Sequence, residues 1–128
     1  MLMTNNDPYI KPTESELEIL QVLWNEGKAT VRKVHEALAG FKDAGYTTTL
    51  KLMQIMHEKG LVGRDDSGKS HIYFALASKE KTQQQFLGKM MNTLFDGSPS
   101  QLMMQALGGQ KPSKEEIEKI EQLLRQYK

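Results

Sequence analysis

The first half of the chain carries three stretches in which apolar residues recur every three or four positions, the spacing of amphipathic helices. In the first stretch, Thr13 and Glu16 match the capping-box pattern, in which each side chain bonds the other residue's backbone N–H. A glycine follows each stretch, as glycines commonly follow helices. We therefore expect helices that start after Thr13, at Thr30 and at about Thr47, and that stop at Gly27, Gly40 and Gly60.

The apolar period then shortens to two, which is typical of β-strands. Residues 61–64 and 71–75 predict two strands joined by the turn "DDSGKS". In the second strand Ile72 and Phe74 alternate with Tyr73, which suits a hairpin. Three helices followed by a hairpin is the element order of a winged helix-turn-helix.

The rest of the chain predicts three short amphipathic helices. The first follows Ser78 and runs to about Phe95, the second follows Ser98 with Pro99 at its first position, and the third opens with a capping box at Ser113. Their apolar stripes are too thin to form a core alone, so the helices must pack either on the first domain or against a second copy of the chain. We favour the second copy. The residues predicted to form this dimer seam are Leu87, Met90, Leu94, Leu102, Ile117, Ile120 and Leu124.

These patterns predict a mainly α protein with a small β-hairpin. We expect a loose tail over residues 1–10, a winged helix-turn-helix DNA-binding domain over residues 11–77 and a helical dimerisation region over residues 78–128. A chain of 128 residues fits one compact domain, or one small domain with an appendage.

Composition narrows the function classes. No apolar run approaches the roughly 20 residues of a transmembrane helix, and the chain has no cysteine for a thiolate metal site or nucleophile. The first residues lack the basic and apolar segments of a signal peptide, so we expect a cytoplasmic protein without stable membrane association. Net charge is only +1, but eight Lys/Arg against five Asp/Glu lie between Lys28 and Lys69. This local excess suits a nucleic-acid partner.

The predicted third helix turns Thr49 inward and a polar face outward. Short hydroxyls at its start let the helix N-terminus approach phosphate, while Lys and Gln side chains reach base edges and an apolar group contacts a thymine methyl. Arg32, on the preceding helix, and Lys69, in the hairpin turn, extend this surface. An ordinary N-cap followed by a solvated face also fits the pattern, so that alternative stays open. The outward residues predicted to contact DNA are Thr47, Thr48, Lys51, Gln54 and Ile55.

Four segments carry a family resemblance: "PTESELEILQVLW", "ATVRKVHEAL", "GYTTTLKLMQIMHEKGLV" and "RDDSGKSHIYFAL". They closely resemble the penicillinase-repressor family, which includes methicillin-resistance and copper-transport repressors. The resemblance is close from Pro12 to Leu76 and extends beyond in layout. It implies a homodimeric winged-helix repressor of transcription that binds a pseudo-palindromic operator in double-stranded DNA. By position, the family's DNA contacts fall on Thr47, Thr48, Leu50, Lys51, Ile55, Lys69, Ser70 and His71.

Two departures from the family pattern bear on function. Many members have Arg where this chain has Ile55, so operator preference is expected to differ. Members that respond to β-lactams are inactivated by cleavage of an Asn–Phe bond, and the matching bond here is Gln105–Ala106. That bond is the candidate regulatory cleavage position, and a membrane sensor protease the candidate partner, although the changed residues argue against the same cleavage.

Other chemistries have weaker support. His35, His57 and His71 accompany no metal-binding or catalytic motif, so we expect no enzyme activity, cofactor or metal. Two alternatives to a simple repressor stay open. One is a regulator controlled by a small molecule at the helical dimer interface, where Met90 and Met91 could line an apolar pocket. The other is a winged-helix module that binds protein.

Overall fold

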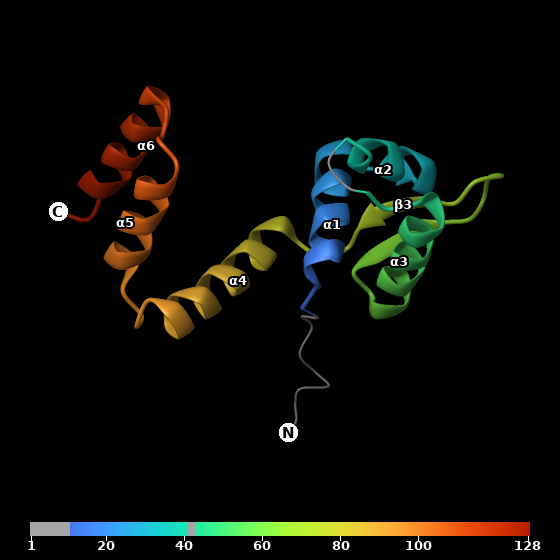
Figure 1. The fold of residues 1–128 in the computed structure, drawn as a ribbon, viewed down its shortest axis with the longest axis horizontal. Coiled ribbons are helices and arrows are strands. Elements are labelled where there is room, and N and C mark those ends of the chain that lie inside the picture. Colours follow the sequence, from blue (N-terminus) through green and yellow to red (C-terminus); the bar gives the residue numbers. More distant parts are fainter. Residues whose placement is uncertain (1–10, 41–42) are drawn as a thin grey trace, which may run out of the picture. The chain divides into compact units, whose positions relative to one another are not determined.

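The computed structural model describes residues 11–40 and 43–128, so the predicted tail over residues 1–10 lies outside the described residues. The chain forms two compact units, residues 1–83 and 84–128. The domain boundary expected at residue 78 stays a prediction. In chain order the elements are α1 (Glu14–Glu26), β1 (Ala29–Thr30), α2 (Val31–Leu38), α3 (Tyr46–Lys59), β2 (Val62–Asp65), β3 (Ile72–Ala75), α4 (Lys79–Leu94), α5 (Pro99–Gly109) and α6 (Lys114–Arg125) (Figure 1).

Helix ends follow the local chemistry of the sequence. In α1 the Thr13 hydroxyl accepts from the Glu16 backbone N–H at 3.2 Å, and the Glu16 carboxylate accepts from the Thr13 N–H at 2.9 Å. Ser113 and Glu116 form the same pair of bonds at the start of α6. Both predicted capping boxes are therefore confirmed, and each satisfies backbone donors that the first turn leaves free.

The core of the first unit lies between α1, α2, α3 and a small sheet. Each helix contributes one stripe, and the sheet adds residues from β2 and β3. Most of these positions lie in the three helical stretches in which apolar residues recur every three or four positions. The buried apolar residues are Ile19, Leu20, Leu23, Ala29, Val31, Val34, Leu38, Met53, Met56, Leu61, Val62 and Tyr73.

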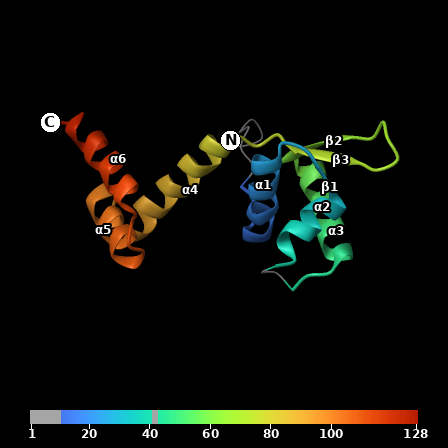
Figure 2. The same cartoon turned by 90° about the horizontal axis from the view of Figure 1, so that it is seen from above.

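The sheet has three antiparallel strands in the order β1–β3–β2, one more than the predicted hairpin. The added strand, β1, pairs Ala29 with Tyr73 and Thr30 with Ile72. A two-residue strand has no period to detect, and Thr30 also caps α2 by accepting from the Lys33 N–H at 3.2 Å. β2 and β3 run side by side, and their connecting turn projects beyond the helices of this unit (Figures 1 and 2). We call residues 66–71 the wing.

Tyr73 is the residue of β3 that reaches the core, although the alternation placed it opposite the apolar Ile72 and Phe74. Its side chain is fully buried because that face of the sheet packs against α1. Phe74 instead covers Gly63 on the neighbouring strand, where an added Cβ would lie 2.4 Å from the Phe74 ring. Gly63 is therefore required by a close approach, since any side chain there would displace the ring.

An ion pair between a buried carboxylate and a partly exposed lysine joins α1 to the far end of α3. Glu16 is 2 % exposed, and Lys59 Nζ donates to both of its carboxylate oxygens, at 2.8 and 2.9 Å. Burial alone would raise the pKa of Glu16, but hydrogen bonds from Lys59 and Thr13, together with the lysine charge, hold that pKa below its ordinary value. The carboxylate therefore stays charged where it is buried.

The indole of Trp24 fixes the chain after the sheet. Its Nε1 donates to the carbonyl oxygen of Ala77 at 2.9 Å, across 53 positions of sequence. The contact joins the last turns of α1 to the segment between β3 and α4. Ser78, one residue on, accepts from the Lys81 N–H at 3.2 Å and so begins α4 as predicted.

The second unit lacks a core of its own. No residue of 84–128 is buried, and α4, α5 and α6 make few contacts with one another. Most of the large apolar side chains that are exposed among the described residues lie here. They are Leu87, Met90, Leu94, Met104, Leu107, Ile117, Leu123, Leu124 and Tyr127.

None of the helices in residues 11–40 and 43–128 combines the length and the apolarity that crossing a bilayer requires.

Replacing Glu16 by Gln should lower the free energy of unfolding by about 1–3 kcal/mol at pH 7, since the charged hydrogen bonds to Lys59 are lost. The folded-state pKa of Glu16 lies below 4.5. The contribution is therefore complete above that pH and disappears as pH falls through the folded-state pKa. Urea unfolding at pH 3 to 7 measures both effects. Glu14→Gln, on the exposed side of the same helix turn, is the control, and equal losses in both variants would contradict a stabilising role for the ion pair.

Candidate nucleic-acid interface

The outward face of α3 carries the predicted contact residues. Thr47, Thr48, Lys51 and Gln54 are exposed, while Thr49, the third threonine of the run, is 4 % exposed and turned into the core. The N-cap of the helix is Gly45, which has no side chain to bond the first N–H groups. The start of α3 is thus open to a ligand along both its side chains and its backbone.

Two predicted contact residues are less accessible than the rest. Leu50 is half-buried and packs against the hydrophobic core, because it lies at the edge between the two faces of α3. Ile55 is also half-buried. The contacts proposed for both residues stay predictions, and the structure leaves only part of each side chain for a partner.

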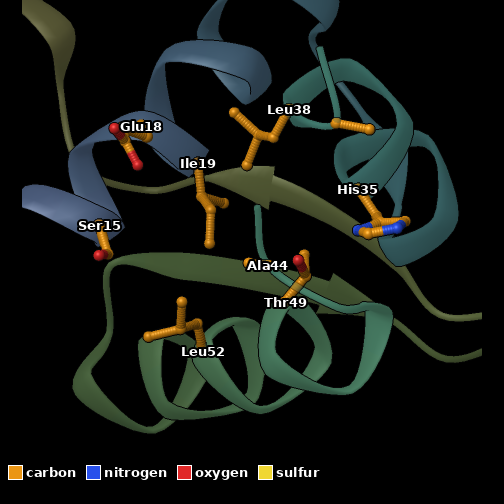
Figure 3. Close-up of a pocket in the computed structure, with 9 residues that line it drawn as sticks. Ser15, Glu18, Ile19, His35, Leu38, Ala44, Thr49 and Leu52 are labelled. Carbon is orange, nitrogen blue, oxygen red and sulfur yellow. The ribbon is translucent and has the colours of Figure 1, made fainter. Parts of the chain in front are cut away.

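α3 is seated on α1 and α2 around a small cavity (Figure 3). Ile19, Leu38 and Leu52 supply apolar walls, and Thr49 and His35 lie at its border. Its volume of about 20 Å³ is enough for about one water molecule and for nothing larger. The cavity is a packing gap under the helix and not a ligand pocket.

Three side chains are in contact where α2 and α3 meet. The ring of Tyr46 meets the ring of His35 edge to face, with centroids 5.8 Å apart and planes at 82°. The Arg32 guanidinium carbon lies 5.8 Å from the centre of the same Tyr46 ring. The sequence predicted no role for Tyr46, because the residues around it do not show that two side chains of α2 contact its ring.

The wing is organised by Asp66. Its Oδ1 lies 2.7 Å from Arg64 Nε and 2.6 Å from His71 Nδ1. With Nδ1 donating to Asp66, His71 offers a second N–H at Nε2 only when the ring is protonated. Lys69 and Ser70, at the tip, are exposed. Asp66 thus pairs with Arg64 of β2, and Lys69 is a cation of the wing without an acidic partner among the described residues.

The same turn is stiffened from its other side by Asp65. The Asp65 Oδ1 accepts from the Ser67 N–H at 2.9 Å and from the Ser67 hydroxyl at 2.7 Å, which lowers the pKa of Asp65. Its charge and these bonds hold the chain as it leaves β2.

Some basic residues of the first unit form intramolecular ion pairs, and others do not. Lys33 pairs with Glu26 at 3.1 Å, and Lys59 and Arg64 have the acidic partners given above. Arg32, Lys51 and Lys69 form no ion pair with any other residue in the part of the chain that the structure describes. These three are the cations that the sequence predicted to contact DNA.

Acidic charge gathers away from α3. A groove of about 600 Å³ runs along α1 and the end of α2, with Leu17 and Val22 among its apolar residues and Glu14, Glu18 and Glu26 among its acidic ones. Its charge has the wrong sign for a phosphate backbone. The acidic side chains of this groove would repel a phosphate backbone.

The histidines do not form a site. His35 and His57 lie on α2 and α3, and His71 lies in the wing. Within residues 11–40 and 43–128 there is no group of three or more side chains that could hold a metal ion.

The candidate cleavage position lies inside a helix. Gln105 and Ala106 are both exposed, but the bond between them belongs to α5. A protease that needs an extended segment would act only after local opening of that helix.

Comparison with known proteins assigns the family. Residues 12–126 match the family model described as penicillinase repressor. The chain belongs to the penicillinase repressor family. Members of this family are DNA-binding repressors of transcription and not enzymes, so the chain is a winged-helix repressor.

Individual relatives agree with this assignment. The methicillin resistance regulatory protein MecI of Staphylococcus aureus is 20 % identical over 112 residues, covering 88 % of this chain and 91 % of MecI. The transcriptional regulator BlaI of Mycobacterium tuberculosis is 31 % identical over 67 residues, 52 % of this chain and 49 % of BlaI. A MarR family protein from Bacillus stearothermophilus shares the fold, with a TM-score of 0.53 at 24 % identity over 96 % of this chain and 75 % of that one.

Lys69→Ala should flatten the dependence of log affinity on log salt by about one per wing, because one phosphate contact is lost. Its effect should be equal on specific and random DNA. Lys33→Ala is the matched control, since Glu26 already neutralises that lysine, and its slope should change less. Fluorescence anisotropy over a salt series measures both. A Lys33→Ala slope change as large as that of Lys69→Ala would show that the ion pairs do not select the DNA contacts.

Proposed function

We propose that this repressor binds a pseudo-palindromic operator in the cytoplasm as a homodimer, with α3 of each subunit in the major groove and the wing on the backbone. The observation that carries the proposal is the exposed face of α3 flanked by free cations. Arg32 lies on one side of it and Lys69 in the wing, and Lys51 lies on the face itself.

The order of residues along α3 suits this docking. Thr47 and Thr48 come first and are small enough for the helix N-terminus to approach phosphate, which the free N–H groups attract. Lys51 and Gln54 follow, at the height where side chains reach base edges in the major groove. Ile55 presents its exposed part beside them and fits a thymine methyl.

The second unit supports dimerisation. Of the predicted seam residues, Leu94 is 72 % exposed and Leu87, Met90, Ile117 and Leu124 are about half exposed. Leu102 and Ile120 are half-buried. A second copy would supply the missing apolar surface, and exposed patches of this kind mark association sites.

Regulation by proteolysis is a separate part of the proposal. A membrane sensor protease that cut Gln105–Ala106 would separate α6 from the rest of the seam. Since the bond is helical, cleavage would first require α5 to open. A gene for a membrane metallopeptidase next to the repressor gene would support this route.

The mobility of operator DNA on gels tests the main proposal. DNA from upstream of the protein's own gene should be retarded at submicromolar protein, with a steep loss of affinity as salt rises. Absence of retardation at micromolar protein would instead favour one of the two alternatives, a protein-binding module or a regulator whose DNA binding needs a small molecule. The acidic groove on α1 is the surface that a protein-binding module would use.

Lys51→Ala should lower operator affinity at least about tenfold, because a base contact contributes about 1–3 kcal/mol and a dimer loses it twice. Its effect on random DNA should be much smaller, in contrast to Lys69→Ala. Competition between operator and random DNA on gels measures the difference. Equal losses on both DNAs would remove Lys51 from base reading.

Leu124→Asp should convert the protein to monomers, since it places a charge in the apolar stripe of α6. Sedimentation velocity measures the oligomeric state, and circular dichroism checks that the helices of the first unit stay folded. Gln122→Asp adds the same charge at an exposed polar position of the same helix and should leave the dimer intact. A dimer that survives Leu124→Asp would contradict this seam.

A further inference from the structure

Tyr46 is the first residue of α3 and its side chain is 42 % exposed. Two side chains of α2 contact its ring. His35 meets the ring edge to face, and the Arg32 guanidinium carbon lies 5.8 Å from the ring centre. The ring therefore joins the two helices of the helix-turn-helix at their corner.

The two contacts converge on one ring because of helical spacing. Arg32 and His35 are three positions apart on α2, so they share one face of the helix. A guanidinium within about 6 Å of an aromatic centre is attracted by the ring electrons. His35 packs against the same ring and so helps fix its orientation. Tyr46 thus provides a fixed surface next to a long, flexible arginine.

Arg32 is free for an external partner. It is exposed, and within residues 11–40 and 43–128 no carboxylate lies within 4.0 Å of its guanidinium. The neighbouring Lys33, by contrast, is held by Glu26 at 3.1 Å. Of the two adjacent cations on α2, the one without an acid partner is the one placed against Tyr46.

We propose that Tyr46 is a positioning residue for DNA binding, whose ring holds the Arg32 guanidinium ready for a backbone phosphate beside the start of α3. The inference rests on the proposed function. An arginine held in place before binding loses less side-chain freedom when it takes a phosphate, so its contact is stronger than that of a free arginine.

The test uses the full-length protein and operator DNA, with affinity measured by anisotropy over a salt series. Arg32→Ala should flatten the salt slope by about one per subunit. Tyr46→Leu should lower operator affinity about two- to fivefold per half-site, the range of an exposed cation–π contact. Tyr46→Phe keeps the ring and should bind like the wild type. In the Arg32→Ala background, Tyr46→Leu should have almost no further effect, because the arginine that it positions is gone.

Other outcomes have distinct meanings. If the wild type does not bind operator specifically, the proposed function fails and this inference fails with it. If the wild type binds but Tyr46→Leu costs nothing, or costs the same with and without Arg32, the positioning role is overturned. The second of these results would be produced by general damage to α3. If Tyr46→Phe loses as much as Tyr46→Leu, the tyrosine hydroxyl contacts DNA directly, and the inference is overturned in favour of that contact.

Discussion

The placement of α3 depends on the hydrogen bonds that the Glu16 carboxylate accepts. It completes the N-cap of α1 and, in the same position, accepts both hydrogen bonds from Lys59 at the end of α3. A charge buried to this degree is tolerated only with such partners. Because one group serves both helices, the start of α1 and the end of α3 cannot shift independently. The contacts of Tyr46 with Arg32 and His35 constrain the start of α3, so the helix is held near both termini.

Charge pairing within the first unit bears directly on function. A modest excess of basic residues would bind DNA weakly if each cation were paired with a nearby acid of the protein. Instead Glu26, Asp66 and Glu16 each pair with a cation, whereas Arg32, Lys51 and Lys69 have no acidic partner among the described residues. The near-neutral total of the chain therefore conceals a local positive surface, which is the quantity that matters for nucleic-acid binding.

Signals that are local in sequence predicted most of the fold. Capping boxes, helix-ending glycines and apolar periods predicted the six helices and two of the three strands found in residues 11–40 and 43–128, because neighbouring residues determine these features. The features that the sequence did not predict depend on residues far apart in the chain. β1 exists only because Tyr73 and Ile72 lie beside it, and the burial of Tyr73 follows from the packing of the sheet on α1. For the candidate site, helical periodicity placed Lys51 and Gln54 outward and Thr49 inward. The core contact of Leu50 and the contacts of Arg32 and His35 with Tyr46 could not be predicted, because they depend on tertiary packing.

Trp24 is the single tryptophan of the chain, so the tryptophan fluorescence of the protein comes from this one side chain. It is half-buried in the first unit, where its indole is bonded to Ala77. Its fluorescence therefore reports the melting of residues 11–83 alone. Far-ultraviolet circular dichroism, by contrast, sums the helices of both units. Comparing the two transitions in one sample shows whether the units unfold together or in separate steps, since coincident probes are the mark of a two-state process. The native sequence thus contains an optical label for one of its two units, and no dye has to be attached.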